Sequence, residues 1–346
     1  MKRIILAIAA ITAIAACTKS EVTYEAPGEI GFAPVTGNIT KASGKAGALT
    51  TDQELGIYAF WDKDLVFPQG QNNVVVGNSY GDYTDNYLVN ALFASKTATS
   101  WGGSPTGHPW PVNGALVFAG YTTPGDVVLT TGTQNGNVTY DLSSDTMTFT
   151  GYNNSSEFDL CWFGRTAYSY NNRKDGTAIG IELSHALSWI TIAAYAEKSA
   201  IGWTITSMKW KVPTSGTAAC TGSGDSAEAV WDPVTYPEES ADPTNILSDS
   251  HTLKAISDEG KGAILTNNLV IPSFPVNLTI DYTFMVNGVP KTDSKTVSLK
   301  LADGNTQKWV SGVHYTYTLK FEANEILVSP SYGNWDEDND NNVTVE

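Results

Sequence analysis

Apolar and polar residues alternate over short runs along most of this chain. Two runs near the C-terminal end have an apolar residue at every second position: Val276, Leu278, Ile280, Tyr282 and Phe284, then Tyr315, Tyr317, Leu319 and Phe321. Side chains of a β-strand point alternately to its two faces, so each run predicts a strand with one apolar face. Clusters of Gly, Asn, Asp, Ser and Pro separate the runs, as turns would. The predicted strands are residues 29–35, 55–61, 74–76, 115–121, 127–130, 138–142, 147–151, 178–183, 186–196, 204–212, 263–271, 276–286, 294–301 and 314–321.

Two segments depart from this pattern. In residues 85–95, Tyr87, Leu88, Ala91 and Leu92 recur at helical spacing, which predicts one short helix. Residues 215–259 are poor in apolar runs and rich in Gly, Ser, Asp and Pro, so we expect long loops there. Strands do not alternate with long helices anywhere, which disfavours a parallel α/β sheet. The predicted fold class is therefore all-β, with antiparallel sandwiches.

The N-terminus has the pattern of a secretion signal. Lys2 and Arg3 precede an apolar run over residues 4–16 that ends at Cys17. Thirteen residues are too few to span a hydrocarbon core, which needs about 20, so the run indicates a signal peptide. Residues 14–17, Ile-Ala-Ala-Cys, resemble a bacterial lipobox, in which the thiol of the cysteine is lipidated. We expect a signal peptide over residues 1–16, a lipid on Cys17, and a propeptide over residues 17–41 that comprises a polar tether and the first strand. The alternative is an ordinary signal peptide that contains a cysteine.

Length and composition describe a folded chain of about two domains. The 346 residues are 41% hydrophobic, 11% aromatic and only 16% charged, which excludes disorder and coiled coils. The polar residues 171–177 interrupt two apolar stretches, and we place a domain boundary there, giving sandwiches at residues 42–176 and 177–346. The same residues could equally form a loop inside one domain.

The charge balance removes one class of partner. The chain has 20 Lys and Arg against 36 Asp and Glu, a net charge of -16. Without Lys2 and Arg3 the mature chain would have 18 basic and 36 acidic residues, or -18. A field of this sign repels nucleic acid and anionic membrane surfaces.

Cysteine and histidine are too few and too scattered to predict a metal or disulfide framework. There are 3 Cys and 4 His, and no His has a second His or Cys at ligand spacing. We therefore expect no metal and no cofactor. If Cys17 is lipidated, Cys161 and Cys220 remain, either as a pair or as two buried thiols.

No catalytic motif is convincing. Residues 77–81 match the G-x-S-x-G string of hydrolases with Ser79, but the string lacks the strand and helix that such a nucleophile needs. A Gly-rich turn is favoured, and we expect no enzymatic activity. The acidic residues 336–342 resemble a calcium loop but lack its Gly at the sixth place and Glu at the twelfth, which favours a solvated loop.

Ten tryptophans raise the alternative of sugar binding by stacking. Trp189, Trp203 and Trp210, however, fall in predicted strands, where an aromatic residue of the core is the commoner explanation. A glycan-binding surface lipoprotein is therefore kept as the alternative function.

Several short motifs follow the lipobox in a definite order. They are EIGFAPV at 29–35, TKA at 40–42, LGIYA at 55–59, ALVFAGY at 115–121, DLCW at 159–162, SHALSWI at 184–190, Trp309 with Gly312 and YTY at 315–317, and Pro330 before Trp335. Together they resemble the fimbrillin family, the type V pilins of Bacteroidetes, over nearly the whole chain. Residues 215–259 match no pattern of that family.

The resemblance implies a fold and an assembly mechanism. It implies two tandem transthyretin-like, Greek-key sandwiches on an outer-membrane lipoprotein at the cell surface. An Arg- or Lys-directed protease would remove the first strand, and the groove so opened would accept a strand from the next subunit. In this chain the preferred cleavage lies between Lys41 and Ala42, with Lys45 second.

The same resemblance assigns residues to the exchange. The displaced strand would carry Ile30, Phe32 and Val35, and candidate donors at the C-terminus are Ile326 with Val328 and Val343 with Val345. Alternatively, residues 29–35 are a permanent first strand of an anchor or tip subunit. The expected function is a fimbrial structural subunit with a role in adhesion, whose partners are other pilin subunits, a protease, and a host or bacterial surface ligand.

Overall fold

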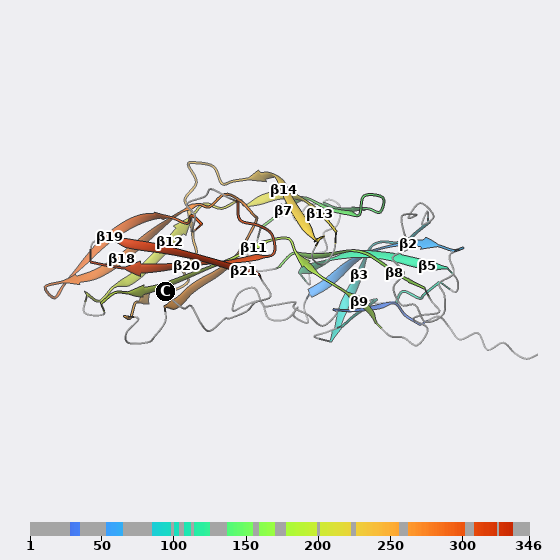
Figure 1. The fold of residues 1–346 in the computed structure, drawn as a ribbon, viewed down its shortest axis with the longest axis horizontal. Coiled ribbons are helices and arrows are strands. Elements are labelled where there is room, and N and C mark those ends of the chain that lie inside the picture. Colours follow the sequence, from blue (N-terminus) through green and yellow to red (C-terminus); the bar gives the residue numbers. More distant parts are fainter. Residues whose placement is uncertain are drawn as a thin grey trace, which may run out of the picture.

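The protein is elongated and nearly all β (Figure 1). The structure is a computed structural model that describes residues 28–34, 53–64, 85–97, 100–103, 107–111, 114–124, 137–154, 159–169, 178–198, 201–222, 226–255, 262–301, 308–323 and 325–334. In these ranges, no helix has the length and apolar character needed to cross a membrane. The predicted all-β class is confirmed, and four sheets build the molecule.

An eight-stranded sheet forms one end of the molecule, with the strand order β10-β8-β5-β2-β3-β4-β1-β9. Its strands are β1 (Gly31–Pro34), β2 (Gln53–Asp62), β3 (Asp85–Thr97), β4 (Ser100–Gly103), β5 (Ala115–Pro124), β8 (Cys161–Ser169), β9 (Ile179–Ile181) and β10 (Ser184–His185). The sheet is strongly curled: β8 and β9, which lie near its opposite ends, contribute side chains to the same apolar cluster. The hydroxyl of Tyr168 on β8 also donates to the carbonyl of Gly180 on β9 at 3.4 Å.

A four-stranded sheet covers the other face of β5 and β8. Its order is β14-β13-β7-β6, and its strands are β6 (Asn137–Asp141), β7 (Thr146–Asn153), β13 (Ser215–Thr221) and β14 (Glu228–Thr235). Phe149 of β7 packs edge-on against Tyr121 of β5, with ring centroids 5.5 Å apart. The predicted strands at residues 138–142 and 147–151 are confirmed as β6 and β7, which form a hairpin with Asp145 in a left-handed conformation at its turn.

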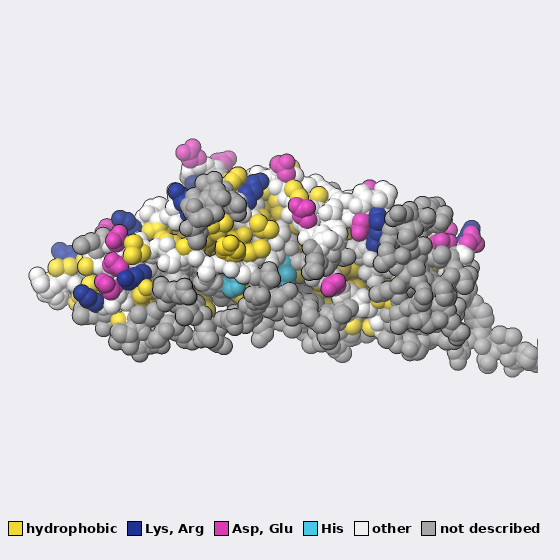
Figure 2. Space-filling view, viewed as in Figure 1, with side chains coloured by type: hydrophobic (Ala, Val, Ile, Leu, Met, Phe, Trp, Pro, Cys, Tyr) yellow, Lys and Arg dark blue, Asp and Glu magenta, His cyan; other side chains and the backbone are white. Residues whose placement is uncertain are grey.

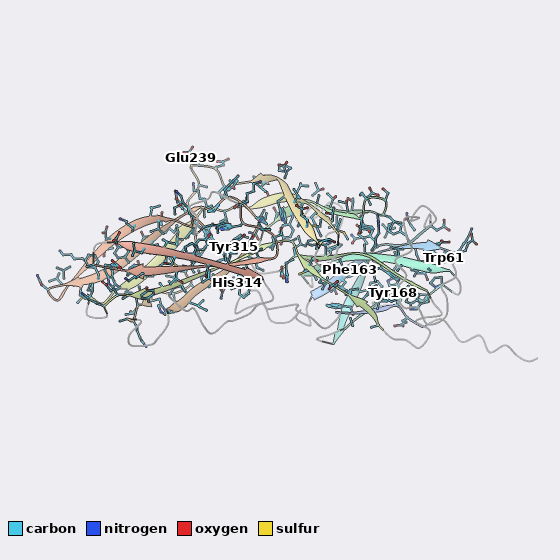
Figure 3. All side chains as sticks on the ribbon, viewed as in Figure 1. Trp61, Phe163, Tyr168, Glu239, His314 and Tyr315 are labelled. Atoms are coloured by element: carbon cyan, nitrogen blue, oxygen red, sulfur yellow. The ribbon has the colours of Figure 1, made fainter. Side chains whose placement is uncertain are left out.

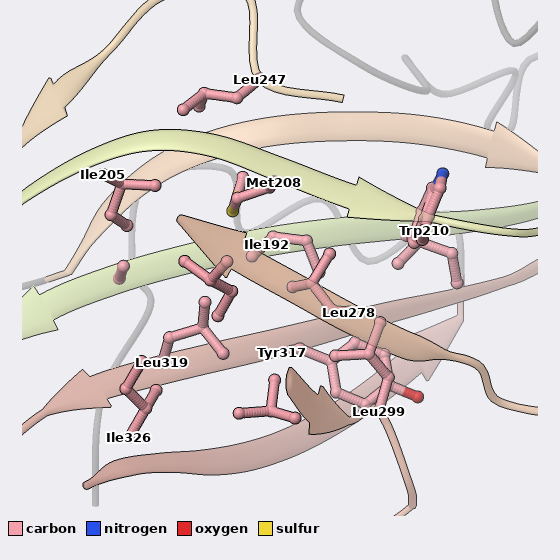
Figure 4. Close-up of a cluster of buried hydrophobic side chains, with 14 of the residues drawn as sticks. Ile192, Ile205, Met208, Trp210, Leu247, Leu278, Leu299, Tyr317, Leu319 and Ile326 are labelled. Carbon is pink, nitrogen blue, oxygen red and sulfur yellow. The ribbon is translucent and has the colours of Figure 1, made fainter. Parts of the chain in front are cut away.

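Two further sheets form a sandwich at the other end of the molecule. One has the order β17-β11-β20-β21 and the other β15-β12-β18-β19, with β16 also paired to β12. Ile192, Met208 and Leu278 lie in the apolar core between them (Figure 4). The strands are β11 (Ser188–Ala196), β12 (Thr204–Trp210), β15 (Thr244–Asn245), β16 (His251–Thr252), β17 (Ala263–Val270), β18 (Asn277–Val286), β19 (Val289–Ser298), β20 (Val313–Phe321) and β21 (Ile326–Asn334).

The predicted helix over residues 85–95 is wrong, because these residues form β3 between β2 and β4. The register of β3 slips beside Asn90, so that Ile57 pairs with Ala91 while Ala59 pairs with Leu88. This bulge places one extra residue between the apolar positions and lets Val89 point to solvent. The apolar spacing of three therefore comes from a bulged strand and not from a helical turn.

The predicted loops over residues 215–259 are also wrong, because this segment contains β13 to β16. On β13 the buried positions are small residues, Gly216, Ala218 and Cys220, which do not stand out as an apolar run. Trp231 packs there from β14, and its indole nitrogen donates to the carbonyl of Ala186 at 2.7 Å.

Cys161 and Cys220 are both buried and form no disulfide, so the alternative of two buried thiols holds and the pair does not. Burial raises the pKa of the Cys220 thiol, which keeps it protonated at neutral pH.

Strands that precede the predicted domain boundary at residues 176 and 177 pair with strands that follow it. β9 and β10 follow this point but pair with β1 and β8, and β13 pairs with β7. The division into sandwiches at residues 42–176 and 177–346 stays a prediction.

Candidate strand-exchange site

β1 is a short strand inserted between two others. It runs antiparallel to β4, with Phe32 opposite Trp101, and parallel to β9, with Phe32 opposite Ile179. The pairing continues before the strand, where the Ile30 amide donates to the His108 carbonyl at 2.7 Å. Removing β1 would therefore leave the hydrogen-bonding groups of β4 and β9 facing an open slot.

Phe32 occupies the centre of an aromatic pocket. Its ring lies edge-on to Phe93 and Phe118, with centroids 5.1 and 5.4 Å away, and 6.1 Å from the tilted ring of Phe163. Figure 3 shows Phe163 and Tyr168 along β8, in the half of the molecule that holds β1. Ile30 and Phe32 have no exposed surface at all. Burying each stabilises the fold by about 1.5–3 kcal/mol.

Gly31 lies between these two anchors and allows a close approach of β1 to β4. A Cβ atom at this position would stand 3.2 Å from the Trp101 carbonyl oxygen. Ile30, directly before β1, and Phe32 within it are buried in the same apolar cluster, so these two residues make up the apolar part of the site.

Residues 107–111, between β4 and β5 in the chain, contact the residues that lead into β1. The Trp110 amide donates to the Gly28 carbonyl at 3.1 Å, and Phe93 faces the His108 ring with centroids 5.0 Å apart. Burial lowers the pKa of His108, against the smaller opposite effect of the Glu29 carboxylate, so the imidazole is mainly neutral at neutral pH.

β21 is the edge strand of the other sandwich, and it carries one pair of predicted donor residues. It pairs with β20 along its whole length, with Ile326 opposite Phe321 and Val328 opposite Leu319. Ile326 is buried in the core and Val328 packs against it, whereas Leu327 and Tyr332 face solvent. Figure 1 shows β21 in the sandwich that does not contain β1, so the two predicted strands do not meet within one chain.

The remaining predicted residues lie outside the described part of the chain. They are Cys17, Val35, Lys41, Ala42, Lys45, Ser79, Val343, Val345 and residues 336–342. Their assignments stay predictions.

The sequence prediction named the displaced residues but missed their pocket. Phe93 was placed on a helix, and Phe163 lies on a strand that the pattern did not predict. The repeated aromatic residues of neighbouring strands could have suggested a pocket, but only the curl of the sheet brings Phe93, Phe118 and Phe163 around one ring.

The fold is similar to that of a fimbrial protein of Bacteroides. The chain is similar to the crystal structure of a fimbrial protein from Bacteroides vulgatus, with a TM-score of 0.57 and 16% identity over 89% of this chain and 99% of that one. Proteins provisionally assigned to cell adhesion from Bacteroides ovatus and Bacteroides uniformis give TM-scores of 0.49 and 0.48 at 14% identity, covering 90% and 89% of this chain and 98% and 99% of theirs. No family model matches the chain, and neither does any curated protein. The expected resemblance to fimbrial proteins is confirmed for the fold.

Proposed function

We propose that this chain is a non-enzymatic structural subunit of a surface fibre, assembled by strand exchange after proteolytic removal of β1. The proposal rests on the position of β1 in the sheet. This four-residue strand lies between β4 and β9, and its Phe32 lies in an aromatic pocket. Withdrawal of a strand from such a place creates both an unpaired backbone slot and an apolar groove. Another extended chain with alternating apolar residues is the natural occupant.

The fold likeness to a fimbrial protein supports this role and supports a place on the cell surface. In the proposed sequence of events, Cys17 carries a lipid that tethers the subunit to the outer membrane. A Lys- or Arg-directed protease then cuts between Lys41 and Ala42, which separates residues 29–35 from the chain that follows.

Of the two predicted donors, Val343 with Val345 is the better candidate. Donation of Ile326 and Val328 would take β21 away from β20 and uncover Leu319 and Phe321, which are both buried. Using residues 335–346 as the donor would leave every described pairing of β20 and β21 in place. The proposal therefore assigns the donor strand to the segment after β21.

The glycan-binding alternative gains nothing from the structure. Eight of the ten tryptophans are buried, and Trp335 lies outside the described residues. Trp61 is half-buried and lies 6.2 Å, centroid to centroid, from Tyr87. Stacking on sugar needs an exposed aromatic face, so a second function is not proposed.

Controlled proteolysis tests the assembly. The purified chain is treated with a Lys-specific protease and run on a denaturing gel without boiling, beside a variant that begins at Ala42. We expect a ladder of oligomers from both, because each lacks β1. Lys41→Ala should slow formation of the ladder more than the matched variant Lys45→Ala does. The double variant should prevent the ladder, because Lys45 is the second predicted cleavage site.

One deletion separates the donor candidates. Loss of residues 335–346 should abolish the ladder while the unfolding transition of the monomer stays unchanged. If the chain that begins at Ala42 folds and remains monomeric, or the deletion leaves the ladder intact, the proposed exchange is wrong.

A further inference from the structure

Three side chains with metal-binding atoms meet where β8 pairs with β10. Asp159 lies just before β8, Cys161 is its first residue, and His185 is the last residue of β10. β8 and β10 pair antiparallel, with His185 directly opposite Cys161, so the backbone brings the two side chains together. Each of the three residues is nine-tenths or more buried.

The ligand atoms form a compact triangle. His185 Nδ1 is 2.5 Å from Asp159 Oδ2, Cys161 Sγ is 3.2 Å from the same oxygen, and Sγ is 3.5 Å from Nδ1. All three atoms lie within 4.8 Å of one another. In a tetrahedral zinc site, metal bonds of about 2.0–2.3 Å put neighbouring ligand atoms roughly 3.3–3.7 Å apart. The distances from Cys161 Sγ to the other two atoms are close to that spacing. Only the distance between Asp159 Oδ2 and His185 Nδ1 must increase.

A second observation points to a ligand. The other carboxylate oxygen, Asp159 Oδ1, is buried and has no hydrogen-bond partner. A buried polar atom without a partner is costly, and its desolvation is offset if the atom coordinates an ion. With both carboxylate oxygens as ligands, the cluster offers four donor atoms: two oxygens, one sulfur and one nitrogen.

We propose that Asp159, Cys161 and His185 form a binding site for one zinc ion. A thiolate and an imidazole favour Zn²⁺ over Mg²⁺ and Ca²⁺, which prefer all-oxygen sites. Binding requires the thiolate and a free Nδ1 lone pair, so the ion displaces the thiol proton of Cys161 to solvent, and the neutral imidazole of His185 binds as the tautomer that carries its proton on Nε2. The sequence did not indicate the site, because His185 lies 24 positions from Cys161 and only the pairing of β8 with β10 joins them.

A bound ion would stabilise the connection between β10, in the eight-stranded sheet, and β11, in the sandwich at the other end. Directly after His185, the Ala186 carbonyl accepts hydrogen bonds from Ser311 Oγ at 2.9 Å and from the Trp231 indole. The Leu187 carbonyl accepts from the Gly312 amide at 2.8 Å. An ion that joins β8 to β10 would therefore fix the start of this connection, next to the residues that contact Trp231, Ser311 and Gly312.

Elemental analysis and cobalt spectroscopy test the proposal on the full chain. The reduced protein, stripped with chelator, is mixed with equimolar zinc and passed through gel filtration; separately it is titrated with Co²⁺. We expect one zinc ion retained per chain, a higher melting temperature, and a Co²⁺ spectrum with a thiolate charge-transfer band and tetrahedral visible bands.

Cys161→Ser should lose the charge-transfer band, and the matched variant Cys220→Ser, which changes the other buried thiol, should keep it. Circular dichroism checks that both variants fold. Absence of retained zinc in the folded wild-type chain overturns the proposal, as does a charge-transfer band that survives in Cys161→Ser.

Discussion

At the scale of single residues, the stability of the eight-stranded sheet depends on a small number of aromatic anchors. Phe32 contributes to the core although it comes from a strand of only four residues. Its neighbours Phe93 and Phe118 lie on β3 and β5, so the pocket around it does not depend on β1 for its other walls.

Phe32→Ala should lower the free energy of unfolding by about 3–5 kcal/mol, because it removes a fully buried ring and leaves a cavity. Urea unfolding of the uncleaved chain measures this. Val89→Ala on the exposed face of β3 is the matched control and should change stability by no more than about 0.5 kcal/mol. An equal effect of the two substitutions would contradict the burial of Phe32.

A polar cluster around Asp281 predicts an acid-dependent contribution. Hydrogen bonds from Lys209 at 2.8 Å, Ser207 at 2.6 Å and Ser294 at 2.7 Å lower the pKa of Asp281 to about 2. These partners lie on β12 and β19, on either side of β18, so one carboxylate joins three strands.

Because the pKa of Asp281 is lower in the folded chain, its contribution is present above about pH 4 and is lost as the pH falls toward 2. Asp281→Asn should therefore cost about 1 kcal/mol or less at pH 7, since the pair is partly exposed. The difference from wild type should shrink steadily below pH 4, which urea unfolding at several pH values can measure. A stability difference that grows at low pH would contradict a lowered pKa of Asp281 in the folded chain.

At the scale of elements, irregularities in the strands explain the wrong predictions. β3 has the pattern of a helix because its bulge at Asn90 spaces apolar residues three apart. β13 has the pattern of a loop because small residues fill its buried face. Regular strands such as β18 and β20 were predicted closely, since each has one apolar face against a single core. A local pattern is reliable where an element keeps one period and has one buried face, and fails where pairing with neighbours changes either.

The bulge of β3 can be tested at Asn90, which has φ of 49° and accepts a hydrogen bond from the Tyr121 hydroxyl at 2.7 Å. Asn90→Ala and Asn90→Gly both lose that hydrogen bond, but only glycine adopts this backbone conformation without strain. We expect Asn90→Ala to be less stable than Asn90→Gly by about 1 kcal/mol in thermal unfolding. Equal stability of the two variants would show that the bulge does not require a positive φ.

At the scale of the whole molecule, charge is spread over an elongated body. On the face drawn in Figure 2, acidic and basic side chains are interspersed and do not form a single patch. The net charge of -16 is nevertheless large, and subunits of one kind repel one another at low ionic strength.

Fibre growth should therefore accelerate when salt is added. We expect the elongation rate of the chain that begins at Ala42 to rise between roughly 10 mM and 150 mM NaCl, as the Debye length shortens from about 30 to 8 Å. Light scattering measures the rate, and an uncharged osmolyte serves as the control. A rate that falls over this range would indicate that attraction between opposite charges drives the contact.

The sequence by itself determined the all-β class, the strands with a regular apolar face, and the apolar residues Ile30 and Phe32, because each depends on a period that neighbouring residues set. Only the tertiary structure decided that β1 lies between β4 and β9, that Phe93 and Phe163 enclose Phe32, and that Asp159, Cys161 and His185 meet. These features arise from pairing between strands far apart in the chain and from the curl of a sheet. Such pairing is chosen by the packing of whole faces, which no local run of residues specifies.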